Sequence, residues 1–153
     1  GTAPLAHLPG IRDLVADMAP FFDKWAAVEG RFHGDRSRRD PPARVRPDGA
    51  RRRAADAGIE CIGCGVCYAA CDVVAWRPEY PGPAALNRAW TLVNDERDTA
   101  GIDRLRKIAG ADGCLACHTH MSCSEHCPKQ ITPTAGIAGL KRACAAAALK
   151  GEL

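Results

Sequence analysis

Apolar residues along the chain recur at helical spacing rather than at the spacing of a strand. Over residues 11–28 they fall three and four positions apart, which predicts an amphipathic helix with one wide apolar face. Pro20 lies in the middle of this segment and predicts a kink or a break there. Four more helices are predicted, over residues 51–59, 84–97, 99–109 and 133–149. Because no stretch shows sustained period-two alternation of β-branched residues, we expect an all-α fold.

The length and composition are those of one globular domain. The chain has 153 residues, of which 46% are hydrophobic and 25% are charged. The longest stretch without Asp, Glu, Lys or Arg is Gly113–Ser124, which has twelve residues. A membrane-spanning helix needs roughly 20 apolar residues, so the sequence predicts no such helix.

Positive charge is concentrated in one segment, residues 31–53. This segment holds nine Arg against three Asp, although the net charge of the whole chain is only +3. Pro and Gly interrupt it, and its single aromatic residue is Phe32 at the edge, so it offers neither a stacking platform nor a groove-reading helix for nucleic acid. We expect a solvated Arg/Pro-rich connector that docks on an acidic partner or on lipid headgroups.

Nine cysteines dominate the chemistry of the sequence. Their number is odd, and eight of them fall into two tight clusters. Cysteines two or three residues apart pair poorly with each other but converge well on a metal, which counts against a disulfide scaffold. The sequence therefore predicts a metal protein in a reducing compartment. The nine are Cys61, Cys64, Cys67, Cys71, Cys114, Cys117, Cys123, Cys127 and Cys144.

The first cluster, CIGCGVCYAAC, has the spacing C-x2-C-x2-C-x3-C. This is the bacterial ferredoxin run, in which the first three thiolates hold one iron–sulfur cluster and the fourth serves another. Gly63 and Gly65 let the backbone pass close to the cluster and aim its N–H groups at the sulfides. We expect the fourth thiolate, on Cys71, to point away from the other three.

The second cluster keeps the same register but lacks one thiolate, because His120 stands where the pattern requires Cys. By the crossing rule, Cys127 completes the first site and Cys71 joins the second. Three thiolates suit a [3Fe–4S] cluster, although His120 could act as a fourth ligand and complete a second [4Fe–4S] cluster. The predicted ligands are Cys61, Cys64, Cys67 and Cys127 for a [4Fe–4S] cluster, and Cys71, Cys117 and Cys123 for the [3Fe–4S] cluster.

Two cysteines and one other metal remain to be considered. Cys114 falls outside the register and is expected to bind no metal, and Cys144 is expected to fill space in an Ala-rich helix. Structural zinc also uses C-x2-C pairs, but two zinc sites would not require the double ferredoxin register. Paired iron–sulfur clusters are therefore the stronger interpretation.

The chain resembles the C-terminal domain of the iron–sulfur subunit of succinate dehydrogenase and quinol:fumarate reductase. Four segments carry the resemblance: LPGIRDLVADMAPFF, CIGCGVCYAAC, YPGPAALNRAWTLVNDERD and CHTHMSCSEHCPKQITPTAGIAGLKR. The resemblance implies an α-helical ferredoxin-like domain over residues 1–153, with the connector 31–53 within it. It also implies a [2Fe–2S] cluster in an N-terminal domain that this sequence lacks, because no cysteine precedes Cys61.

In that family the subunit is non-catalytic and carries electrons between a flavoprotein (FAD) subunit and a membrane quinone, through the [4Fe–4S] and then the [3Fe–4S] cluster. The resemblance further implies hydrophobic anchor subunits. It places the subunit at the cytoplasmic face of the bacterial inner membrane, or at the matrix face of the mitochondrial one. The alternative is a ferredoxin-like module of another quinone- or heterodisulfide-linked oxidoreductase.

By position, Trp76 and His118 fall where the family has quinone-pocket residues. An indole N–H suits a quinone carbonyl, and a histidine can supply protons. From the residues alone, the alternatives are that Trp76 is an amphipathic ring at the surface and that His118 is an ordinary loop histidine. The sequence departs from the family at two nearby positions, with Asp72 in place of the common Pro and His120 in place of an apolar residue.

Overall fold

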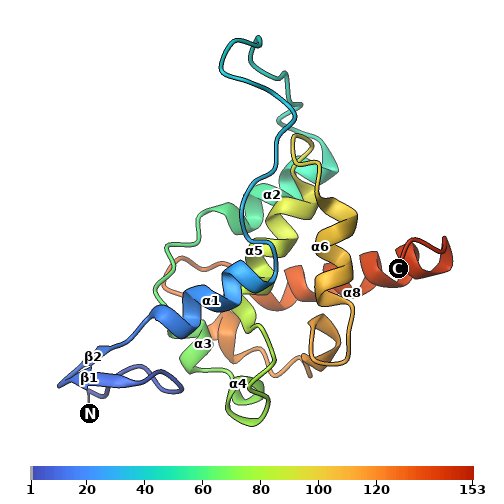
Figure 1. The fold of residues 1–153 in the computed structure, drawn as a ribbon. Helices are drawn as coiled ribbons and strands as arrows, with labels where there is room; N and C mark the ends of the chain where they lie inside the picture. The colour runs from blue at the N-terminus through green and yellow to red at the C-terminus, as the bar shows by residue number, and fades with distance from the viewer. Residues whose placement is uncertain (1) are drawn as a thin grey trace.

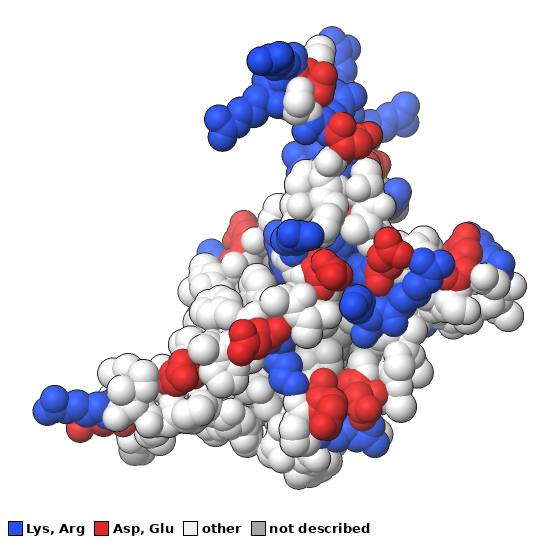
Figure 2. Space-filling model, in the orientation of Figure 1, with Lys and Arg blue, Asp and Glu red and all other residues white. Residues whose placement is uncertain are grey.

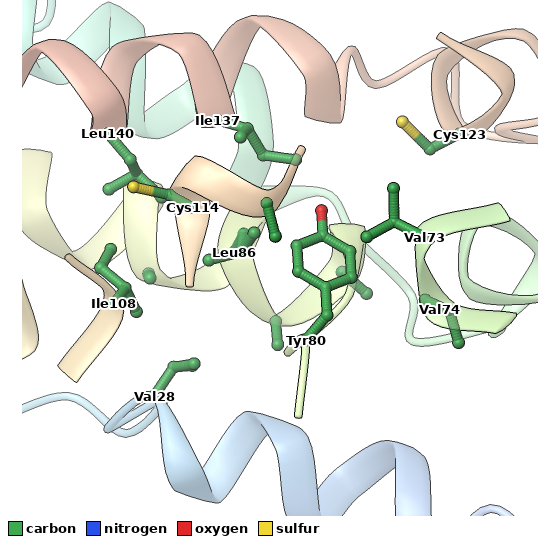
Figure 3. Close-up of a cluster of buried hydrophobic side chains, with 14 of the residues drawn as sticks. Val28, Val73, Val74, Tyr80, Leu86, Ile108, Cys114, Cys123, Ile137 and Leu140 are labelled. Atoms are coloured by element: carbon green, nitrogen blue, oxygen red, sulfur yellow. The ribbon is translucent and has the colours of Figure 1, made fainter. Parts of the chain in front are cut away.

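Two helices form the centre of the molecule in the computed structural model, which describes residues 2–153. They are α5 (Pro83–Asn94) and α8 (Pro133–Leu149) (Figure 1). The Trp90 side chain of α5 lies against two glycines of α8, and a Cβ atom at Gly139 would stand only 2.4 Å from its ring. Leu86, Ile137 and Leu140 are fully buried between the helices (Figure 3).

Three further helices pack around this pair, and shorter helical segments fill the loops between them. Asn87 of α5 donates a hydrogen bond to the Gly58 carbonyl (3.0 Å), which fixes α2 against α5. Phe21 of α1 packs edge-on against Tyr68, with ring centroids 5.6 Å apart. The larger helices are α1 (Ala19–Ala27), α2 (Ala50–Ile59) and α6 (Gly101–Ile108). The short segments are α3 (Val66–Ala69), α4 (Asp72–Trp76), η1 (Cys114–Ala116) and α7 (Ser122–Glu125).

The predicted helix over residues 11–28 is wrong in its first half. That part forms an antiparallel hairpin of β1 (Gly10–Arg12) and β2 (Val15–Ala16), joined through Asp13 with a φ of 50°. The helix begins only at Ala19, so Pro20 lies in its first turn, where a missing N–H leaves no hydrogen bond unmade. Ile11, in β1, is 68% exposed and takes no part in the core. The fold is therefore mostly helical rather than all-α.

The other four predicted helices are confirmed as α2, α5, α6 and α8. The largest difference lies at the end of α5, which stops at Asn94 instead of residue 97. Asp95 there adopts an extended conformation and accepts hydrogen bonds from the Arg97 backbone and guanidinium at 2.7–3.0 Å. These bonds hold the pKa of Asp95 at about 2, well below its usual value.

The Arg-rich connector is irregular up to Gly49 and projects from the helices as an arm at the end of the molecule opposite α4 (Figures 1 and 2). Its base is fixed by Arg104 of α6, which is fully buried and pairs with Asp98 at 2.8 Å. Arg104 also donates to the carbonyls of Glu29 and Arg31. Burial alone would raise the pKa of Asp98, but hydrogen bonds from Arg104 and from backbone N–H groups lower it.

Candidate metal centres

The two cysteine runs form loops with the same backbone geometry. Each residue of the first run lies 56 positions before its counterpart in the second. Gly65 (φ 76°, ψ −6°) precedes α3, and its counterpart Met121 (φ 68°, ψ −5°) precedes α7. Gly63 (φ 65°) and its counterpart Thr119 (φ 64°) are also left-handed. The chain thus contains a structural repeat, in which each loop leads into one short helix.

His120 occupies the position in the second loop that Cys64 has in the first. The hydrogen bonds that follow are matched as well: the Ala69 N–H donates to the Gly65 carbonyl at 3.0 Å, and the Glu125 N–H to the Met121 carbonyl at 3.1 Å. The second loop therefore keeps the conformation of the first while presenting an imidazole in place of one thiol.

The first cavity, of about 400 Å³, is lined by the four thiols that the crossing rule groups together: Cys61, Cys64, Cys67 and Cys127. Cys127 reaches it from the second repeat. Lys129 and Glu60, whose charged groups lie 3.3 Å apart, join the chain beyond Cys127 to the chain before Cys61. Ala84 of α5 and Pro133 of α8 complete part of the wall.

The second cavity, of about 330 Å³, is lined by the other three: Cys71, Cys117 and Cys123. Cys71 comes from the first repeat, so the crossing is reciprocal. The Cys123 sulfur lies 3.3 Å from the Thr134 hydroxyl of α8, and Lys141 of α8 donates to the Cys117 carbonyl at 2.7 Å. Since α5 and α8 both begin beside the two cavities, the central helices hold the loops in place.

Three of the seven cavity thiols favour the neutral form in the absence of a nearby positive charge. Burial raises the pKa of Cys67 to about 12, and it also raises the pKa of Cys61 and Cys71. Because the thiolate is the form that binds metal, these groups need irons whose charge offsets the burial.

The donor set fits a polynuclear cluster. Within residues 2–153, no group of three or more His, Cys, Asp or Glu side chains converges closely enough to hold a single metal ion. The thiols are instead distributed around the walls of two cavities. An iron–sulfur cluster takes its cysteine sulfurs at separate irons, so its ligands stand farther apart than those of one ion.

The two predicted quinone-pocket residues, Trp76 and His118, both have their rings next to the ring of His120, which lines the second cavity. His120 was not assigned to the quinone pocket from the sequence. Trp76 is 67% exposed, and its ring meets the His120 ring edge-on with centroids 6.3 Å apart. The His118 ring lies 6.3 Å from His120 on the other side. His118, His120 and Asp72 line the cavity mouth. An exposed aromatic group, which we call the aromatic trio (Trp76, His118 and His120), therefore lies beside the second cavity: two of its members line the cavity, and Trp76 contacts one of them.

Cys114 and Cys144 lie outside both cavities. Both are buried, and their sulfurs are 3.9 Å apart. Burial, together with the neighbouring Cys144, raises the pKa of Cys114 to about 12. Their surroundings are those of core residues.

Comparison with known proteins reveals a family of electron-transfer subunits. Residues 58–131 match the family model described as "4Fe-4S dicluster domain". The chain is 34% identical over 139 residues to the succinate dehydrogenase iron–sulfur subunit of Paracoccus denitrificans, a match that covers 90% of the chain and 53% of the relative. It is 34% identical over 140 residues to the mitochondrial succinate dehydrogenase [ubiquinone] iron–sulfur subunit 2 of Oryza sativa subsp. japonica, covering 90% and 45% respectively.

A fumarate reductase iron–sulfur subunit, from Mycobacterium tuberculosis (strain CDC 1551 / Oshkosh), is 36% identical over 149 residues, covering 96% of the chain and 60% of the relative. The chain thus spans about half the length of the curated relatives it matches. None of the helices in residues 2–153 has both the length and the apolar character that a membrane crossing needs. Over most of its length the chain is homologous to the iron–sulfur subunits of succinate dehydrogenases and fumarate reductases, and it carries a 4Fe-4S dicluster domain.

Proposed function

We propose that this chain is the two-cluster part of the iron–sulfur subunit of a succinate:quinone oxidoreductase, a succinate dehydrogenase or fumarate reductase. It passes electrons between a flavoprotein subunit and a membrane quinone and performs no bond chemistry itself. The observation that carries the proposal is the pair of adjacent cavities lined by four and three thiols, in a chain whose curated relatives are such subunits.

In this proposal the first cavity holds a [4Fe–4S] cluster and the second a [3Fe–4S] cluster. The clusters supply one-electron storage at two neighbouring points. The chain supplies thiolates, backbone N–H groups from the repeated loops, and walls that exclude water. Cys61, Cys64, Cys67 and Cys127 bind the first cluster, and Cys71, Cys117 and Cys123 bind the second.

The second cavity is the quinone end of the chain. Its support is the exposed aromatic trio, because the indole N–H of Trp76 can donate to a quinone carbonyl and the imidazole of His118 can carry a proton. In this orientation the end bearing α4 faces hydrophobic anchor subunits, so the protein is peripheral to the membrane. The Arg-rich arm lies at the opposite end (Figure 2), where its positive charge suits an acidic partner surface.

The test is EPR of the anaerobically purified complex, oxidised and then reduced with dithionite, with iron and sulfide counted on the same sample. Beyond the two irons of the [2Fe–2S] cluster and any haem iron of the complex, we expect about seven irons, an oxidised-state signal from the three-iron cluster, and a new signal on reduction. A silent oxidised state with about eight irons would mean that a second [4Fe–4S] cluster forms. Zinc without iron would refute the proposal.

Succinate-dependent quinone reduction by the same complex separates this function from the alternative. A ferredoxin-like module of another quinone- or heterodisulfide-linked enzyme would show the iron without this activity.

A further inference from the structure

Tyr80 has a buried hydroxyl without a hydrogen-bond partner. The residue is 1% exposed, and in residues 2–153 the only other buried side-chain nitrogen or oxygen without a partner is the Trp25 indole nitrogen. Tyr80 lies in the loop between α4 and α5, where its backbone N–H donates to the Arg77 carbonyl at 3.0 Å. The backbone of Tyr80 is therefore anchored, whereas the group at the end of its side chain is left unsatisfied. A buried polar group in this condition calls for an explanation.

The Tyr80 side chain lines the second cavity together with its three cysteines. Figure 3 shows the hydroxyl pointing into the space between Ile137 on one side and Val73 and Cys123 on the other. Val73 and Ile137, which also line this cavity, offer no side-chain acceptor. Thr134 is already engaged, with the Ser124 hydroxyl at 2.9 Å and the Cys123 sulfur at 3.3 Å. Of the polar groups on the cavity wall, the sulfurs of Cys117, Cys71 and Cys123 are the ones that act on the Tyr80 hydroxyl, so sulfur is the acceptor beside it.

The hydroxyl is also in the right protonation state to donate. The ordinary pKa of a tyrosine hydroxyl is about 10, far above neutral pH. The group is a neutral phenol, and a phenol O–H is a hydrogen-bond donor.

We propose that the Tyr80 hydroxyl donates a hydrogen bond to a sulfur of the cluster in the second cavity and thereby raises the reduction potential of that cluster. The inference rests on the proposed function, because it requires an iron–sulfur cluster in this cavity. A donor to sulfur stabilises the reduced cluster, which carries one more negative charge, more than the oxidised one. Tyr80 does not line the first cavity, and neither does any other hydroxyl side chain of residues 2–153. Tyr80 thus helps to make the two potentials differ.

The experiment is a redox titration of the intact complex with the Tyr80→Phe subunit, followed by EPR of both clusters. Removing the donor should lower the equilibrium constant for one-electron reduction of the second cluster about tenfold, which is about 59 mV toward lower potential. The potential of the first cluster should stay unchanged. The substitution deletes one oxygen that has no partner in the protein, so the fold should not depend on it.

Tyr68→Phe is the matched control, because it makes the same chemical change at the second of the two tyrosines. Tyr68 is buried in α3 but does not line the second cavity. Because the Tyr68 side chain is still close enough to Cys71 to interact with its thiol, its substitution should shift the potential of the second cluster much less than Tyr80→Phe does. An equal shift in both variants, or an unchanged potential in Tyr80→Phe, would overturn the inference.

Loss of cluster content is equally informative. If Tyr80→Phe loses the second cluster and keeps the first, the inference is supported, since the hydroxyl has no other partner to lose. If both clusters are lost, Tyr80 serves the fold and the inference is overturned. A wild-type complex without iron–sulfur clusters would overturn the proposed function as well, and this is seen before any substitution is made.

Discussion

The loops over residues 61–71 and 117–127 have one backbone and two different sets of side chains. In the first loop, glycine occupies both left-handed positions, Gly63 and Gly65. In the second loop, Thr119 and Met121 adopt the same angles, which side-chain-bearing residues rarely do. The second loop thus keeps a left-handed backbone that is energetically unfavourable for its residues, without the glycines that would remove this strain. The common requirement is to bring thiols to a cavity wall, and that requirement explains why the conformation persists.

The surroundings of the loops differ as well. The first loop is covered by the N-terminal part of the chain, since a Cβ atom at Gly65 would lie 3.1 Å from Leu5 and 3.2 Å from Met18. The second loop ends at the exposed aromatic trio. The first loop is covered in part by the N-terminal segment, whereas the second presents exposed aromatic rings. In the proposed function, this is the difference between an inner relay and a terminal one.

The largest effect is expected from matched substitutions at the equivalent positions of the two loops. Cys64→Ala should remove the first cluster, with a loss of about four irons and of the reduced-state EPR signal, because a thiolate ligand is gone. His120→Ala should leave the iron content unchanged, because the assigned second site uses only three thiolates. Retention of the first cluster in Cys64→Ala, or loss of the second in His120→Ala, would contradict the assignment.

Making the loops equal should convert the second site. His120→Cys places a thiol where the first loop has Cys64, so the second cluster should gain a fourth iron and lose its oxidised-state EPR signal. Iron analysis together with EPR of the oxidised protein measures this change. If the oxidised-state signal of His120→Cys persists at full intensity, position 120 is not equivalent to position 64 as a ligand position. His120→Ser, which has no thiol, is the control.

A smaller effect is expected at the aromatic trio beside the second site. Trp76→Phe keeps an exposed ring but removes the indole N–H, so the KM for quinone should rise roughly tenfold through the loss of one hydrogen bond. Electron transfer from succinate to a soluble acceptor should not change. Phe22→Leu, at a half-exposed ring beside the first loop, should alter neither rate. If the two variants affect quinone reduction equally, the aromatic trio does not mark the quinone side.

The smallest effect is expected at the thiols that lie outside both cavities. Cys114→Ala should leave the iron content and both EPR signals unchanged and lower the free energy of unfolding by only about 1 kcal/mol, as a small core truncation does. Thermal or denaturant unfolding measures the second quantity. Any loss of iron would show that Cys114 takes part in a cluster and that the register rule fails in the second loop.

Sequence reasoning succeeded where a pattern repeats over several turns or at fixed spacing. The four later helices follow from apolar periodicity, and the grouping of thiols around two cavities follows from cysteine spacing. The hairpin was missed because Ile11, Leu14 and Val15 have helical spacing, and Pro20 was read as a kink within a helix rather than as its start. All three apolar residues remain exposed, so no core fixes the predicted helix.

The side chains around the second cavity were predicted only in part, for a different reason. Tyr80 is a single aromatic residue in a loop, and a single residue carries no periodicity that could reveal its target. The contact between Trp76 and His120 joins distant parts of the chain, so it becomes visible only once the loops are folded. The one signal in the sequence was that His120 replaces the apolar residue usual in the family. From the sequence, His120 was interpreted as a possible metal ligand and not as a neighbour of Trp76.

The exchange of Cys71 and Cys127 between the two cavities has a consequence for biosynthesis. The first half of the repeat contains three of the four thiols for one site and a single thiol for the other, so a nascent chain that ends before the second loop can complete neither. If both cavities hold clusters as proposed, both clusters are completed only after residues 117–127 have left the ribosome. In the proposed function, the two clusters are therefore inserted late and together. The same clusters that later carry electrons also cross-link the two halves of the repeat.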